Sequence, residues 1–154
     1  RARTRILLSD SKGVRGQLPS ELGNLGLLEQ LRLPNLRLTG TIPTEIGMLT
    51  NLRSVVLSGN ELNGTIPTEI VNCDMLLDLG LSSNKLSGSL PTELGLLDAL
   101  IGVSVDFNEL SGEIPSELGN LGNLETIQLA VNRLSGALPT ELGRLSSLGK
   151  CRTG

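Results

Sequence analysis

The sequence predicts an α/β repeat solenoid, a stack of six 24-residue coils whose short strands form one shared parallel sheet. An apolar-proline pair recurs every 24 residues without insertion. A glycine lies two residues before each pair, and a glutamate lies two residues after each proline. The pairs are Leu18-Pro19, Ile42-Pro43, Ile66-Pro67, Leu90-Pro91, Ile114-Pro115 and Leu138-Pro139. Three columns with six matches each indicate a repeat rather than chance.

Each coil contains one short segment with strand periodicity. In Val55-Val56-Leu57 and Ile127-Gln128-Leu129, alternate residues are expected to point inward. Such a segment is too short to be stable alone, but stacked every 24 residues it becomes one rung of a parallel sheet. The rest of the coil supplies the long return path that parallel pairing requires. Proline then stops the strand and opens a short helical turn, as in Pro43-Thr44-Glu45-Ile46.

An asparagine column follows the strands, three residues after the last inward position. Its members are Asn60, Asn84, Asn108 and Asn132. A side-chain amide can bond backbone groups that a turn leaves unpaired, so we expect a buried structural ladder. The column is broken at Leu36, where Asn35 is one residue out of register, and at Lys12. The first two coils should therefore have looser turns.

Composition limits the chemistry available to the chain. Phe107 is the only aromatic residue and histidine is absent, which removes the commonest general base and metal ligand. The net charge is -3, yet the stretch from Glu61 to Glu125 contains eleven acids against one base, Lys85. Acidity of this kind disfavours nucleic acid and anionic membranes, and it favours a basic partner or cations.

Nothing in the sequence indicates catalysis, a cofactor or a metal site. No nucleophile has a nearby base, and neither a P-loop nor a dinucleotide fingerprint is present. Asp78 and Asp106 are expected about 8 to 9 Å apart, a separation that fits an inverting glycosidase. The chain lacks the aromatic platforms that sugars stack on, so we predict that it is not an enzyme. The glutamate column lacks the further oxygen ligands that calcium prefers.

The two cysteines lie on different columns about three coils apart, roughly 15 Å at ~4.8 Å per coil. They cannot form a disulfide with each other. Cys73 stands in a leucine column and is expected to be a buried thiol, whereas Cys151 could pair with sequence outside the chain.

Two segments carry a resemblance to a known family. Asn60-Glu61-Leu62-Asn63-Gly64-Thr65-Ile66-Pro67 and Asn132-Arg133-Leu134-Ser135-Gly136-Ala137-Leu138-Pro139 resemble the plant-type leucine-rich repeat. The likeness runs from about Leu7 to Leu148. It implies a horseshoe or superhelix with a parallel β-sheet on the concave face, extra short strands beside it and 3₁₀ turns on the convex face. Proteins so built include receptor ectodomains, polygalacturonase-inhibiting proteins and algal arrays, and their partners include proteins, peptides, glycans and small signalling molecules.

The repeat predicts a single solenoid domain over residues 1–154, with repeats at about 7–30, 31–54, 55–78, 79–102, 103–126 and 127–150. The chain begins at Arg1 and lacks the cysteine-bonded caps typical of secreted plant members. We therefore expect a fragment whose ends are covered by missing sequence or by another chain. The family resemblance implies an extracellular or ectodomain setting. No apolar stretch is long enough for direct membrane insertion.

The predicted function is protein or peptide recognition through the concave strand face, as part of a receptor or as a subunit of an assembly. Positions on this face are not dictated by the repeat and vary from coil to coil. The expected binding patch is Asp78, Ser104, Asp106, Phe107, Gln128 and Val131.

A structural or surface-active role such as ice binding is the alternative, through a threonine and serine array on one flank. The array consists of Thr39, Thr41, Asn63, Thr65, Ser87 and Ser89, and it decays at Glu113 and Ala137. The same flank contains the one N-glycosylation sequon, Asn63-Gly64-Thr65, so Asn63 is a candidate glycan acceptor.

Overall fold

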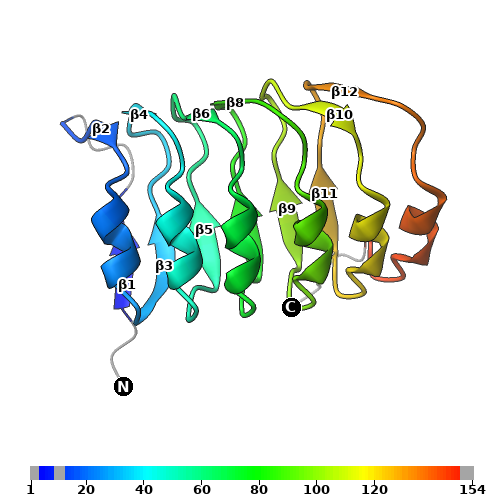
Figure 1. Ribbon diagram of the computed structural model, residues 1–154, viewed down its shortest axis with the longest axis horizontal. Coiled ribbons are helices and arrows are strands. Elements are labelled where there is room, and N and C mark those ends of the chain that lie inside the picture. Colours follow the sequence, from blue (N-terminus) through cyan, green and yellow to red (C-terminus); the bar gives the residue numbers. More distant parts are fainter. Residues whose placement is uncertain (1–3, 9–12, 150–154) are drawn as a thin grey trace.

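The structure is a computed structural model that describes residues 4–8 and 13–149. Its coils stack side by side along one axis, with the helical turns on one side and the sheet on the other (Figure 1). The sheet has six parallel strands in the order β1-β3-β5-β7-β9-β11. Their bounds are β1 Thr4–Leu7, β3 Leu28–Arg32, β5 Ser54–Val56, β7 Asp78–Gly80, β9 Gly102–Ser104 and β11 Thr126–Gln128. The predicted leucine-rich-repeat solenoid is confirmed.

The register of this sheet follows the repeat. From β3 onward, each residue pairs with the one 24 positions later, as Leu31 does with Val55 and Val55 with Leu79. The β1–β3 pair departs from this rule, because Ile6 pairs with Leu31 after an irregularity between Thr4 and Arg5. A constant register of one repeat length places equivalent side chains in straight columns.

Short strands form a second set of pairs along one edge of the stack. The pairs are β2 (Gly16–Gln17) with β4 (Leu38–Thr39), β6 (Asn63–Gly64) with β8 (Lys85–Leu86), and β10 (Ser111–Glu113) with β12 (Arg133–Ser135). Ser111 pairs with Arg133, which is 22 positions later, so these strands are staggered by two residues relative to the repeat. The resemblance implied extra strands, and these pairs confirm them.

The opposite side of the stack consists of 3₁₀ helices, and every helix in the described ranges is of this type. They are η1 Ser20–Asn24, η2 Thr44–Met48, η3 Thr68–Asn72, η4 Thr92–Leu96, η5 Ser116–Asn120 and η6 Thr140–Arg144. Each begins directly after a proline, and before η1 to η5 this proline is extended, for example Pro67 at φ -67 and ψ 134. The final residues alternate along the stack: asparagine ends η1, η3 and η5, whereas Met48, Leu96 and Arg144 end η2, η4 and η6.

The helices pack closely because most of them contain a glycine. A side-chain carbon at Gly47 would lie 2.4 Å from the Glu69 carbonyl oxygen of the next helix, and at Gly95 it would lie 2.4 Å from that of Glu117. Only a residue without Cβ allows this approach. The core beneath is aliphatic: Leu52, Leu76 and Leu100 are fully buried. Each coil therefore covers the leucines of its neighbours.

The asparagine column joins the two sets of strands. Asn60 Nδ2 donates to the carbonyl oxygens of Leu33 and Leu57, both at 2.8 Å. Asn60 Oδ1 accepts from the backbone N–H of Leu38, in β4, at 3.0 Å. Asn84, Asn108 and Asn132 repeat this pattern in their own coils. Each amide bonds backbone of its own and the preceding coil instead of another amide. Asn60 and Asn108 are buried, and the other two are half-buried.

The second coil has a different turn, at the position where the asparagine column is broken. Leu36 occupies the column and is 1% exposed. Its N–H donates to Asn60 Oδ1 at 3.0 Å, whereas the N–H groups of Asn84 and Asn108 donate to backbone carbonyls of the next coil. Asn35 and Arg37 both have positive φ, at 57° and 55°. Lys12, the other break, lies outside the described residues.

Candidate functional site

The predicted binding residues lie on the outward surface of the six-stranded sheet, which we call the strand face. Asp78 begins β7, Ser104 ends β9, Gln128 ends β11, and Asp106, Phe107 and Val131 lie in the turns after β9 and β11. Ser104 and Gln128 are direct register partners. The N–H of Asn108 donates to the Val131 carbonyl at 3.1 Å, which holds the two turns side by side. Five of the six residues therefore share two adjacent coils.

Asp78 stands apart from Asp106. The register places Gly102 opposite Asp78, and Asp106 follows Gly102 by four residues. Four extended residues span about 13 Å along the strand direction, so the expectation of 8 to 9 Å was wrong. That expectation counted the coils correctly but underestimated the offset along the strand. The two aspartates form no carboxylate pair.

Each aspartate is held by a serine of the preceding coil. Ser54 Oγ donates to Asp78 Oδ2 at 3.4 Å, and Ser82 Oγ donates to Asp106 Oδ1. Both aspartates are half-buried. Within the described part of the chain, neither carboxylate forms an ion pair. These bonds leave two oriented negative charges on the strand face.

Phe107 and Val131, which we call the anchor pair, adopt left-handed backbone conformations. Their φ angles are 53° and 52°, and their side chains are 54% and 62% exposed. The equivalent residues of earlier coils are Asn35, Gly59 and Ser83, also with positive φ. Asparagine and glycine suit this region, whereas a β-branched residue there is a rare outlier. The fifth and sixth coils thus hold apolar side chains at strained positions that face solvent.

The N-terminal part of the strand face has the opposite charge. An open hollow of about 500 Å³ is lined by Leu7, Leu8, Gln30, Arg32 and Pro34. Arg32 is exposed at the end of β3, two register steps from Gly80 at the end of β7. The face is therefore basic near its second coil and acidic near its fourth and fifth.

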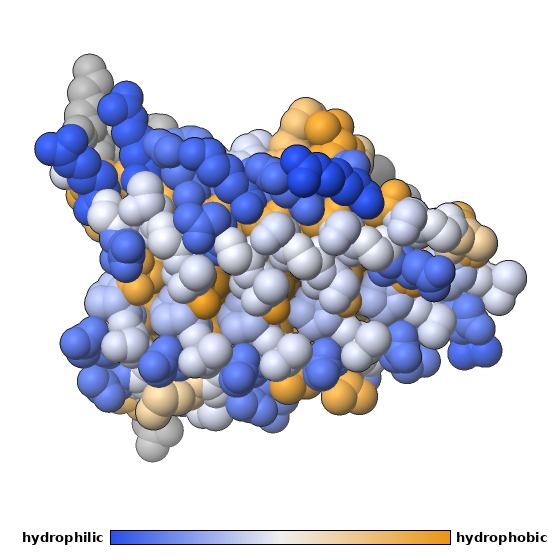
Figure 2. All heavy atoms as spheres, turned by 45° about the horizontal axis from the view of Figure 1, so that its top comes forward, coloured by the Kyte–Doolittle hydropathy of each residue, from blue (hydrophilic) through white to orange (hydrophobic). Residues whose placement is uncertain are grey.

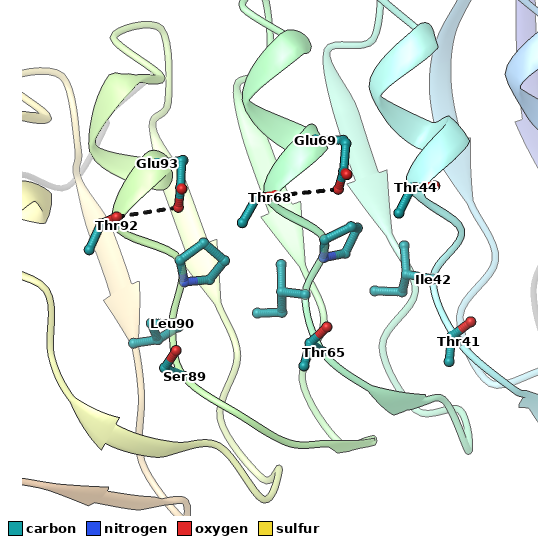
Figure 3. A pocket seen from close by; sticks show the side chains of 13 residues that line it. Thr41, Ile42, Thr44, Thr65, Thr68, Glu69, Ser89, Leu90, Thr92 and Glu93 are labelled. Atoms are coloured by element: carbon teal, nitrogen blue, oxygen red, sulfur yellow. Dashed lines mark hydrogen bonds between the residues drawn. The ribbon is translucent and has the colours of Figure 1, made fainter.

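The flank, formed by the short strands and the segments that lead from them into the 3₁₀ helices, contains a second hollow. A groove of about 530 Å³ runs across the coils, and a further hollow of about 630 Å³ continues it towards the C-terminal coils. Figure 3 shows two hydroxyl columns on its sides. The first column is Thr41, Thr65 and Ser89, which is half of the predicted array, because Thr39, Asn63 and Ser87 do not line the groove. The second column, which the sequence analysis missed, is Thr44, Thr68 and Thr92.

The two hydroxyl columns have different surroundings. Thr68 Oγ1 donates to Glu69 Oε2 at 3.5 Å, and Thr92 Oγ1 donates to Glu93 Oε2 at 3.3 Å (Figure 3). A side-chain carbon on Gly64 would lie 2.9 Å from Thr41 Cγ2, so the threonine methyl packs over the glycine of the next coil. Glu113 replaces the hydroxyl in the fifth coil. The array is regular through the fourth coil and is interrupted there.

Charges of alternating sign follow the loop tips beside the flank. The residues of this loop-tip ladder are Arg37, Glu61, Lys85, Glu109 and Arg133. Lys85 Nζ lies 2.9 Å from Glu61 Oε2, and Arg133 Nη2 lies 2.9 Å from Glu109 Oε2. The hydrogen bond and charge of Lys85 lower the pKa of the Glu61 carboxyl. Figure 2 shows hydrophilic side chains along this edge, with paler columns and apolar strips below it.

Metal-binding side chains do not gather anywhere in residues 4–8 and 13–149. No group of three or more cysteine, aspartate and glutamate side chains there could hold a metal ion. Cys73 is buried, as predicted, and its Sγ donates to the Ile46 carbonyl at 3.3 Å. Burial raises the pKa of its thiol to about 11. Cys151 lies outside the described residues. None of the helices described has the length and apolar character needed to cross a bilayer.

The Leucine Rich Repeat family matches residues 51–73, 75–97 and 123–145. A chain in the structure of the Arabidopsis receptor kinase HAESA, solved with the peptide hormone IDA and the co-receptor SERK1, is 33% identical with a TM-score of 0.82. A plant ice-binding protein is 36% identical with a TM-score of 0.85, and the ectodomain of the receptor kinase SOBIR1 from Arabidopsis thaliana is 36% identical with a TM-score of 0.73. The matches cover 94%, 90% and 78% of this chain but 28%, 45% and 66% of those chains. No curated protein sequence matches.

The repeat, the stacked strands and these similarities define a leucine-rich-repeat protein. Its coils are of the plant type, as in the plant receptor ectodomains that it resembles. Such ectodomains typically serve as binding scaffolds rather than as enzymes.

Proposed function

We propose that this chain is a non-enzymatic recognition scaffold that binds a protein or peptide through its strand face. The anchor pair carries the proposal. Phe107 and Val131 are exposed, adjacent and held in backbone conformations that disfavour their residue types. Strain of this kind persists where surrounding structure enforces it, and it clusters at binding sites. Exposed aromatics are frequent anchors of interfaces.

The proposed contact surface contains Asp78, Ser104, Asp106, Gln128 and the anchor pair. A solenoid that is already rigid loses little conformational entropy on docking, which favours binding without rearrangement. The structural similarity to a receptor kinase solved with a peptide hormone supports this proposal. It also supports an extracellular setting, as part of a receptor ectodomain or of a larger assembly.

Comparing partners captured by matched variants tests this proposal. Chemical cross-linking and mass spectrometry would identify proteins bound by the wild type but lost on Phe107→Asn. Met48→Asn is the control, because Met48 is a similarly exposed apolar residue on the helical side. We expect at least a tenfold loss of affinity for the first variant and none for the control. Equal retention by both variants would remove the anchor pair from the binding surface.

A surface-active role such as ice binding is a second candidate, and the regular hydroxyl columns of the flank favour it. Their repeat of ~4.8 Å per coil suits a ligand that is itself periodic. The similarity to a plant ice-binding protein supports this candidate. Thermal hysteresis of the wild type, lost on Thr65→Arg and kept on Ser104→Arg, is the expected result. Absence of hysteresis in concentrated wild-type protein would contradict the candidate.

We also propose Asn63 as a glycan acceptor. The residue is exposed in β6 and lies in a sequon with Thr65. A glycan there would obstruct the flank and leave the strand face open. A mass increase after expression through a secretory pathway, absent from Asn63→Gln, is the expected outcome. Identical masses for the two proteins would exclude the modification.

A further inference from the structure

We infer that the partner presents an extended basic segment, with an apolar side chain on the anchor pair and cationic side chains against Asp106 and Asp78. This inference rests on the proposed recognition function and names the chemistry of its ligand. The strand face has two kinds of feature that one ligand must satisfy together. Phe107 and Val131 offer exposed apolar surface, and Asp106, next to Phe107 in sequence, offers an oriented carboxylate.

The electrostatics of the site select a cation. Asp78 and Asp106 each accept a hydrogen bond from a serine hydroxyl, and in the described ranges neither pairs with a lysine or arginine. An incoming cation would supply the missing opposite charge. Arg32 stands on the same face two coils before Asp78, so the charge changes sign along the solenoid. A basic ligand is therefore favoured at the fourth to sixth coils and disfavoured at the second.

The shape of the site sets the spacing of those cations. Small residues lie between the two carboxylates, namely Gly80, Ser82, Gly102 and Ser104. Their side chains are short or absent, so little side-chain bulk stands between the two aspartates. The backbone positions of the two aspartates are offset by four residue steps, about 13 Å, along the strand direction. An extended peptide rises about 3.3 Å per residue, and every second side chain points to the same side. Two cationic side chains four positions apart would meet both carboxylates.

Selection from a library of random linear heptapeptides displayed on phage tests this inference. Peptides selected on the immobilised chain should carry lysine or arginine at two positions about four residues apart, with an apolar residue beside one of them. Synthetic copies of the enriched peptides would then be titrated by fluorescence anisotropy. Raising the salt concentration should weaken their binding, because exposed charge pairs are screened.

Matched double variants locate the site. Asp78→Asn with Asp106→Asn should weaken the selected peptides at least tenfold. Asp74→Asn with Asp98→Asn changes the net charge equally at two exposed positions away from the strand face and should leave affinity unchanged. Circular dichroism would verify that both double variants remain folded.

The outcomes separate this inference from the proposed function. Enrichment of neutral or acidic peptides, or equal weakening by the two double variants, would overturn the basic ligand and leave recognition standing. Failure of the wild-type chain to enrich any peptide would count against peptide recognition itself, and this inference would then fall with it.

Discussion

The strand face and the flank are built from the same coil, yet they differ in how strictly the repeat is kept. On the flank, the threonine of one coil packs against the glycine of the next, as Thr41 does on Gly64. On the strand face, equivalent positions carry different residue types, and the equivalents of Asp78 are Ser54 and Gly102. Contact with the backbone of the next coil restricts residue type, whereas exposure to solvent does not.

The same contrast separates the two candidate functions. A surface of identical subsites suits a ligand with its own repeat, because every coil contributes the same contact. A surface whose residues change from coil to coil suits one particular partner, because only one register satisfies all its contacts. Experiments that alter one region and spare the other therefore also discriminate between the functions.

The largest effect is expected at the asparagine column, which joins both regions. Asn108→Ala removes donors to the Leu81 and Val105 carbonyls and the acceptor for the Leu86 N–H. Because these buried groups would lose their partners, the substitution should lower the free energy of unfolding by about 3 kcal/mol. Urea denaturation measures this loss. Asn123→Ala, which removes one exposed bond to the Asp98 carbonyl, is the control and should cost under about 1 kcal/mol. Similar losses for both would show that the column does not join the regions.

Two glycine substitutions compare the regions directly. Gly64 has a φ of 74°, and an added Cβ would lie 2.9 Å from Thr41 Cγ2, so Gly64→Ala should cost about 2 kcal/mol. At Gly80, on the strand face, the nearest atom would lie at 3.5 Å, an ordinary contact. Gly80→Ala should change stability by less than about 0.5 kcal/mol. If thermal denaturation shows a larger loss of stability for Gly80→Ala than for Gly64→Ala, packing on the next coil does not explain why the flank is regular.

Relief of backbone strain at Val131 should increase the stability of the chain, by less than the losses expected at Asn108 and Gly64. Val131→Asn places a residue that tolerates left-handed backbone at φ 52°, and it should stabilise the chain by about 0.5 to 1 kcal/mol. Val56→Asn is the matched change inside β5, where asparagine is unfavourable, and it should destabilise. The first variant should also bind the partner less tightly. A more stable variant with full affinity would separate strain from recognition.

A pH-dependent effect concerns Cys73, which lies in the core away from both regions. Its folded pKa of about 11 exceeds the ordinary value of 9.0, so the neutral thiol is favoured in the folded chain. The resulting stability is complete below pH 9.0 and is lost as the pH rises towards 11. Urea denaturation across this range should show a decline in the wild type that Cys73→Val lacks. Parallel curves for the two proteins would contradict the assignment to Cys73.

Much of the architecture was predictable because the repeat expresses it in every coil. The strands, the helical turns after proline and the exposure of Phe107 follow from period and position. Left-handed backbone at Phe107 and Val131 was not anticipated, because neither residue type indicates it. Asn35 and Gly59, three and two repeats before Phe107 in the same column, were the available signal.

Other features depend on geometry that periodicity does not specify. The short strands are staggered by two residues, as between Ser111 and Arg133, and a 24-residue period does not indicate this register. The second hydroxyl column was missed because Thr44 and its equivalents were interpreted only as residues that open a helix. Replacement of an asparagine by Leu36 was noticed, but a single coil does not reveal that Asn60 supplies the acceptor.

The charges of the loop-tip ladder alternate in sign from coil to coil, so their pattern repeats every two coils. Insertion or deletion of one coil would set like charges beside each other, as Glu61 against Glu109, whereas a change of two coils would preserve every opposite pair. The helix-terminal residues alternate with the same 48-residue spacing, with asparagine at Asn24, Asn72 and Asn120. Two independent columns thus mark a double coil as the natural module for lengthening, shortening or recombining this protein.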